Sequence, residues 1–103
     1  MQSVAAQQEP NVVVDLVSES GERWLLQYFL QEYQSSDGSA LYGVRVDKLV
    51  PEGRLLESNE TFAITDSRDK AAAIVEFLSK GTVPPCVLLD MVDEWFSGEV
   101  WSE

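Results

Sequence analysis

The hydrophobic pattern of this chain changes its period near residue 64. Before that point, apolar and polar residues alternate in short runs that end in clusters of Gly, Pro, Ser and Asp, which is typical of strands joined by turns. After it, apolar residues recur every three or four positions, which is typical of amphipathic helices. The segment 64–96 therefore predicts two helices joined by a Gly/Pro turn, and the strands before it need those helices as a cover.

The first part of the chain predicts four strands, at Val12–Ser18, Arg23–Tyr33, Ala40–Val50 and Arg54–Ile64. The second of these segments fits a helical period equally well, and the Asp37-Gly38 hairpin signal that follows it decides for a strand. One face of this strand then carries Trp24, Leu26, Tyr28 and Leu30. Leu25 and Phe29 lie on the opposite face, where something must cover them.

The third and fourth strands continue the alternation. The apolar face of the third strand carries Tyr42, Val44 and Val46, and the polar face carries Arg45 and Asp47. Gly43 predicts a bulge or a close approach of another backbone, because glycine has no side chain to pack. The fourth strand is expected to turn Leu56, Phe62 and Ile64 inward.

The two helices have recognisable ends. The first is expected to begin after Thr65, Asp66 or Ser67, whose side-chain oxygens can cap free backbone N–H groups, and Gly81 is predicted as its left-handed stop. Its apolar stripe is Ala71, Ile74, Val75 and Leu78. The second helix is expected to begin at Pro84 or Pro85 and to end at Gly98, with Trp95 in the core and apolar pairs every four residues.

The sum predicts an α+β fold, in which a four-stranded antiparallel meander is followed by two C-terminal helices packed on one face of the sheet. Residues 1–10 lack periodicity and are interpreted as a flexible tail, and residues 11–103 as a single domain.

Composition narrows the function class. The chain has 103 residues, 45% of them hydrophobic, and a net charge of −11. Such a surface repels nucleic acid and anionic membranes, although solubilising charge is the simpler reading of it. Cys86 is the single cysteine, so no internal disulfide can form, which suits a reducing cytoplasm. The first residues do not resemble a signal peptide, and no run is long enough for a membrane helix.

Catalytic and metal-binding chemistry is weakly represented. The chain contains no His, which removes the commonest general base and metal ligand. Cys86 is interpreted as a buried or half-buried structural residue, because its surroundings are acidic. Asp90, Asp93 and Glu94 share one helix face, where they fit a solvated acidic surface better than a cation site, since no loop carbonyls accompany them. We therefore expect no catalytic residues, no metal and no cofactor.

Candidate interface residues remain. They lie on the second strand and near the C-terminus, and they are Leu25, Phe29, Asp90, Asp93, Glu94 and Trp101. Trp101 is an aromatic residue among acidic ones beyond Gly98, and it either folds back onto the sheet or meets another chain. A second protomer is one way to cover Leu25 and Phe29.

A family resemblance agrees with this reading. The segments Tyr42–Val46, Ile64–Ser67 and Val83–Trp95 resemble a group of short bacterial proteins of the clostridial kind that form a domain of unknown function. In that group a Tyr-Gly-aliphatic strand precedes a helix, a Val-Thr-Pro turn and an acidic amphipathic C-terminal helix. Pro84 stands here where the group has Thr, so the cap at this turn differs. The resemblance implies a bacterial, cytoplasmic origin and supplies no catalytic residues.

The leading hypothesis is a small, non-enzymatic module that binds another protein, with a homodimer as one form. One alternative is an acidic decoy that imitates nucleic acid and inhibits a basic DNA- or RNA-binding protein, although its short row of carboxylates is a weak phosphate mimic. Another alternative is a small-ligand binder with a pocket between sheet and helices. We expect no direct binding to nucleic acid or membranes.

Overall fold

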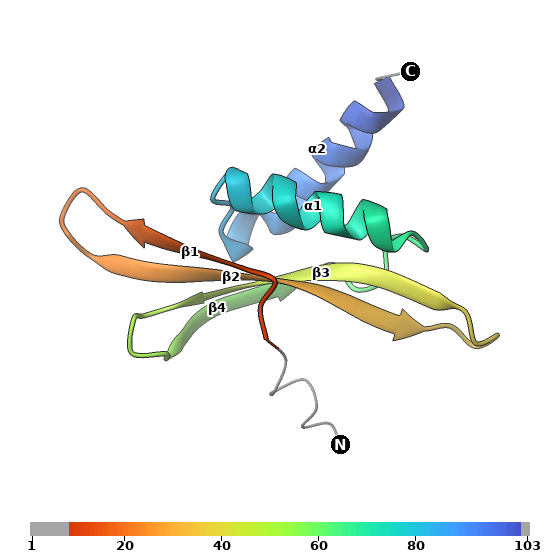
Figure 1. Cartoon of the computed structure of the whole chain (residues 1–103). Helices are drawn as coiled ribbons and strands as arrows, with labels where there is room; N and C mark the ends of the chain where they lie inside the picture. Colours follow the sequence, from red (N-terminus) through yellow and green to blue (C-terminus); the bar gives the residue numbers. More distant parts are fainter. Residues whose placement is uncertain (1–8, 102–103) are drawn as a thin grey trace.

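The computed structural model describes residues 9–101 and, in the last helix, the side chains up to Ser97. Four antiparallel strands form one sheet in the order β1-β2-β3-β4, and the helices follow them (Figure 1). The elements are β1 (Val12–Val17), β2 (Arg23–Gln34), β3 (Ala40–Leu49), β4 (Leu55–Glu60), α1 (Arg68–Lys80), the 3₁₀ turn η2 (Pro85–Val87) and α2 (Leu88–Trp101). The predicted α+β meander is confirmed. Most of the predicted flexible tail, residues 1–8, lies outside the described residues.

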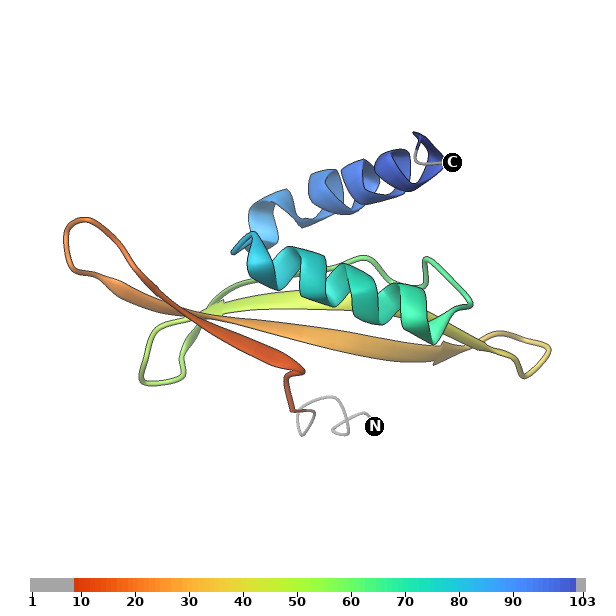
Figure 2. The same ribbon diagram turned by 45° about the horizontal axis from the view of Figure 1, so that its top comes forward.

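Both helices lie on one face of the sheet, called here the helix face, and the other face is the open face (Figure 2). The core forms where the apolar side chains of the strands meet α1, the segment after it and the first turns of α2. Its buried members are Leu26, Tyr28, Val44, Val46, Ile74, Val75, Leu78, Val83, Leu88 and Val92. The predicted facing of β2 and β3 is therefore confirmed, and so is the apolar stripe of α1.

Tyr28 ties the sheet to the segment between the helices. Its side chain is fully buried, and its hydroxyl donates a hydrogen bond to the carbonyl oxygen of Val83 at 3.0 Å. Burial raises the pKa of Tyr28 to about 12, and the hydrogen bond to the Val83 backbone opposes that rise. The phenol therefore stays neutral and donates this hydrogen bond within the core.

Gly43 allows two backbone segments to touch, as the sequence suggested. A Cβ at this position would lie 1.7 Å from the carbonyl oxygen of Phe62. The regular strand ends just before this contact, and Phe62 takes a left-handed φ of 60° with its side chain 62% exposed. The inward placement of Phe62 and of Leu56, which is 38% exposed, was therefore wrong. The register of β4 shifts at Lys48/Leu49, which breaks the assumed alternation.

The N-terminal end of α1 agrees with the prediction, whereas its C-terminal end differs from it. Ser67 caps its N-terminus by accepting the Lys70 N–H at 3.1 Å, as predicted. Gly81 follows its last turn, but with a φ of −87°, so it is not the left-handed stop. Thr82 is the left-handed residue there, with a φ of 53°.

α2 also departs from the prediction. It begins after η2, whose first residue is Pro85, and it continues through Gly98 to Trp101. The expected end at Gly98 was wrong because glycine inside a helix costs only about 1 kcal/mol and need not stop it. Trp95 packs against the margin of the core, half-buried, rather than within it, with its ring 5.2 Å from that of Phe96 in an edge-to-face contact.

Candidate interaction surfaces

The first surface is the outer strand β1, which has apolar side chains on both faces and one charged side chain, Asp15, on the open face. On the helix face, Val12, Val14 and Leu16 are half-buried against the core. On the open face, Val13 and Val17 are 50% and 59% exposed. An outer strand that only covers a core needs apolar residues at alternate positions, so the exposed Val13 and Val17 on the open face are available for a further contact.

The backbone of β1 also presents hydrogen-bonding groups outward. In an antiparallel pair, alternate residues direct their N–H and C=O groups toward the partner strand. The Ser18 N–H donates to the Glu22 carbonyl at 2.8 Å, so the even-numbered residues of β1 face β2. Val13, Asp15 and Val17 therefore direct their backbone groups to the outer side, where residues 9–101 place no further strand.

The charge along this edge is compensated. Asp15 is the one charged residue of β1, and its carboxylate forms an ion pair and hydrogen bond with the Arg23 guanidinium on β2. Both side chains remain about half exposed. In a chain with a net charge of −11, this edge is a nearly neutral strip.

The opposite edge of the sheet, at β4, is protected. The Asn59 side chain accepts the Glu60 N–H at 2.9 Å and donates to the carbonyl oxygen of Pro85 at 3.2 Å, which links the edge to η2. Two carboxylates, Glu57 and Glu60, stand on the same short strand. Such charges disfavour pairing with another acidic chain.

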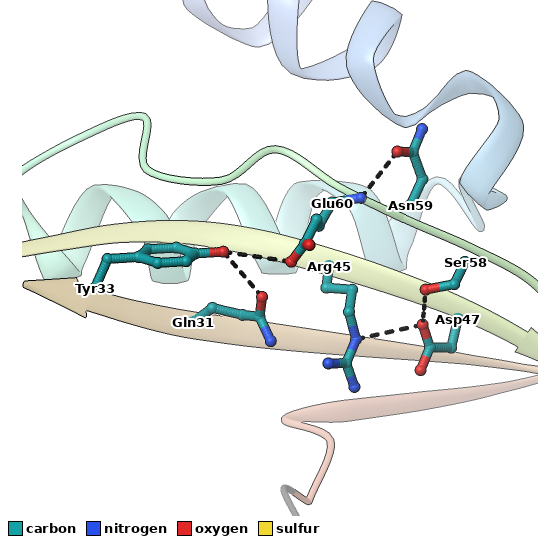
Figure 3. Close-up of polar contacts among 7 residues, drawn as sticks. All are labelled: Gln31, Tyr33, Arg45, Asp47, Ser58, Asn59 and Glu60. Atoms are coloured by element: carbon teal, nitrogen blue, oxygen red, sulfur yellow. Dashed lines mark hydrogen bonds and ion pairs between the residues drawn. The ribbon is translucent and has the colours of Figure 1, made fainter. Parts of the chain in front are cut away.

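The open face of the sheet carries a polar network formed by side chains of β2, β3 and β4 (Figure 3). Phe29 is only 2% exposed, because the Arg45 guanidinium lies 4.0 Å from its ring centroid. Arg45 Nε is 3.3 Å from the Asp47 carboxylate, which also accepts the Ser58 hydroxyl at 2.5 Å. The cover that the sequence requires for Phe29 is therefore supplied by this chain itself.

A tyrosine continues this network. The Tyr33 hydroxyl donates toward Gln31 Oε1 at 3.0 Å and Glu60 Oε1 at 3.4 Å. Burial raises the pKa of Tyr33, the Glu60 carboxylate raises it further, and Arg45 opposes the rise. A neutral phenol and a paired guanidinium make this network suited to holding the face rigid.

A further candidate surface is the outer side of α2. Asp90, Asp93 and Glu94 are all exposed, as expected, and Leu89 beside them is 54% exposed. The opposite side of the helix is anchored by the buried Leu88 and by Val92. Trp101 belongs to the last turn of α2, and its side chain lies outside the described residues.

Other chemistry is sparse on the described part of the chain. Among the residues that the structure describes, no group of three or more His, Cys, Asp or Glu side chains could hold a metal ion. A small open depression of about 190 Å³ lies between β4 and η2, lined in part by Asn59, Pro85 and Cys86. Cys86 is exposed there, so its predicted burial was wrong. Within residues 9–101, no helix is both long and apolar enough to cross a membrane.

The model of a family of unknown function, DUF6514, matches residues 7–98. This chain belongs to the DUF6514 family. The match covers all four strands, α1 and most of α2, so the resemblance to a domain of unknown function is confirmed. No curated protein and no solved structure matches this DUF6514 chain.

The predicted interface residues of this DUF6514 domain do not converge. Leu25 and Phe29 lie on the open face of β2, whereas Asp90, Asp93 and Glu94 lie on a helix that covers the other face. The free edge of β1 was missed by the sequence reading. Its signal was the run Val12–Val17, in which five of the six residues are apolar.

Proposed function

We propose that this chain is a non-enzymatic protein-interaction module of the bacterial cytoplasm, which binds a basic protein partner through the outer side of α2. The observation that supports the proposal is an exposed apolar side chain, Leu89, set among the three exposed carboxylates of Asp90, Asp93 and Glu94. Apolar contacts with a charged rim are typical of protein interfaces.

Charge defines the partner that fits this surface. The sequence has no Lys or Arg after Lys80, so the whole C-terminal part is acidic. A partner with an apolar socket for Leu89 and a rim of Lys and Arg is complementary to it. Complementary charges accelerate association and exclude acidic competitors.

The anchoring of α2 favours recognition without large rearrangement. Leu88 is fully buried and Val92 is 6% exposed, so one side of the helix is held by the core while the other faces solvent. A partner therefore meets a preformed helix, and little ordering entropy is lost on binding.

The test compares two variants with the wild-type chain as baits in a bacterial lysate. Leu89→Lys removes the apolar anchor, and Leu55→Lys makes the same change on β4 at a side chain of nearly equal exposure, 53% against 54%. A captured protein is then purified and its affinity measured. We expect Leu89→Lys to weaken binding by about tenfold or more, a loss of at least about 1.4 kcal/mol, while Leu55→Lys leaves it unchanged.

Equal binding by wild type and Leu89→Lys would refute the role of α2. A captured protein that added DNA displaces would favour the acidic decoy instead. The measurement is repeated at high salt, where charge-steered binding should weaken.

A further inference from the structure

We propose that the outer edge of β1 pairs antiparallel with the same edge of a second copy of this chain, which joins two four-stranded sheets into one. The proposal goes beyond binding through α2, because it uses a different surface and a different partner. It rests on the backbone groups, the side chains and the charge of β1, taken in turn below.

The backbone of β1 is ready to accept a strand. Three residues, Val13, Asp15 and Val17, direct their N–H and C=O groups outward along a strand of six residues. Edge strands are usually protected by proline, lysine, a bulge or a covering element. β1 contains no proline and no lysine, whereas Asn59 and two glutamates protect the edge at β4.

The side chains of β1 gain cover when a strand is added. Val12, Val14 and Leu16 are half-buried against the core, and the same residues of a neighbouring copy would extend that apolar layer. On the open face, Val13 and Val17 would also lose exposed area. Apolar burial on both faces is what stabilises a strand inside a sheet.

The local neutrality and self-complementarity of this edge favour a second copy as the occupant. Two molecules with a net charge of −11 repel each other over most of their surfaces. Self-association therefore requires a locally neutral contact, and at β1 the Asp15 carboxylate is neutralised by Arg23. A two-fold antiparallel pair is also self-complementary, because each outward donor meets an acceptor of the same strand in the other copy.

The geometry favours one register. With Val14 of one copy opposite Val14 of the other, the hydrogen-bonding residue Val13 faces Asp15, and Val12 faces Leu16. No carboxylate then faces a carboxylate, because like charges directly opposite each other destabilise a strand pair. A register centred on Asp15 would place the two Asp15 side chains opposite each other. The Val14 register is the one proposed.

The oligomeric state of the full chain tests the proposal. We expect sedimentation equilibrium to show a concentration-dependent dimer in the micromolar range for the wild type. Val13→Glu should make the chain monomeric, because the new carboxylate would face Asp15 of the other copy. Leu55→Glu on β4 is the matched control, since it adds the same charge at a side chain of similar exposure, 53% against 50%, and should leave the dimer intact.

Cross-linking tests the register. In a Cys86→Ser background, Val14→Cys should form a disulfide between copies under mild oxidation, because directly opposed residues of a non-hydrogen-bonded pair lie about 4.5 Å apart at Cα. Leu16→Cys should react much more slowly, since Leu16 faces Val12 of the other copy. Circular dichroism checks that each variant is folded.

The outcomes separate the two proposals. A monomeric wild type at every concentration, or a Val13→Glu variant that stays dimeric, would overturn the pairing of β1 whatever α2 binds. Faster cross-linking of Leu16→Cys than of Val14→Cys would overturn the register. Loss of partner binding in Leu89→Lys, with the dimer intact, would support α2 as a separate surface.

Discussion

The contact between Gly43 and the segment after β4 can be tested with one methyl group. In Gly43→Ala, the new Cβ would lie 1.7 Å from the Phe62 carbonyl oxygen, 2.6 Å from its carbonyl carbon and 2.9 Å from Thr61 Oγ1. A carbon and an oxygen in favourable contact stay about 3.3 Å apart. The two backbones must therefore separate by roughly 1.6 Å, and no rotation of a side chain relieves a clash with a backbone oxygen.

That separation breaks hydrogen bonds between β3 and the segment that follows β4. The Thr61 N–H donates to the Val44 carbonyl at 2.9 Å, and the Val44 N–H donates to Thr61 Oγ1 at 3.0 Å. Each such bond contributes about 1 kcal/mol, and overpacking adds about 1–3 kcal/mol. The lower backbone entropy of alanine in the unfolded state offsets up to about 1 kcal/mol. We expect a net loss of about 3 kcal/mol, a large part of the stability of a small domain.

Urea unfolding followed by tryptophan fluorescence measures this loss. Gly81→Ala is the control, because the nearest atom to its new Cβ lies 3.5 Å away and the φ of −87° suits alanine. It should be neutral or stabilising by up to about 1 kcal/mol. If both variants unfold at the same urea concentration, the close approach at Gly43 does not exist as described.

Three further predictions concern the core and the helices. Because the pKa of Tyr28 is raised to about 12 from an unfolded value of 10.0, wild-type stability should fall as pH rises through this window, by up to about 2.7 kcal/mol. Tyr28→Phe should lose about 1 kcal/mol at neutral pH and should show less of this alkaline loss, as measured by urea titrations at several pH values. Ser67→Ala should cost about 1 kcal/mol by removing the cap of α1, and Ser67→Asp should restore most of it in thermal melts. Leu88→Ala should cost about 2–5 kcal/mol, and more than Trp95→Ala, because Leu88 is fully buried and Trp95 is only half-buried; the reverse order would contradict the placement of α2.

The strands and their order were predictable because they depend on local signals. The Asp37-Gly38 turn fixes the hairpin between β2 and β3, and alternation fixes which side chains share a face. The register of this hairpin places Phe29 opposite Arg45. The cover of Phe29 could therefore have been found from the turn and the register, without invoking a second protomer.

The errors lie where distant residues decide the local conformation. Phe62 turns outward because its carbonyl packs on Gly43, a contact between residues far apart in sequence that no periodic pattern reports. The end of α2 was misplaced because Gly98 was read as a stop, although the helix continues to Trp101. Helix ends depend on cap geometry, and a glycine supplies a stop only when it takes that geometry.

The two proposed surfaces should respond to salt in opposite directions. Two copies that carry −11 each repel over long range, and the β1 edge between them is neutral, so screening removes repulsion and leaves the apolar and backbone contacts. Self-association should tighten between about 0.05 and 0.5 M NaCl, where the screening length falls severalfold. A basic partner on α2 is attracted through Asp90, Asp93 and Glu94, so its binding should weaken over the same range. If dimerisation also weakens with salt, ion pairs hold the copies together, and the neutral edge of β1 is not the contact.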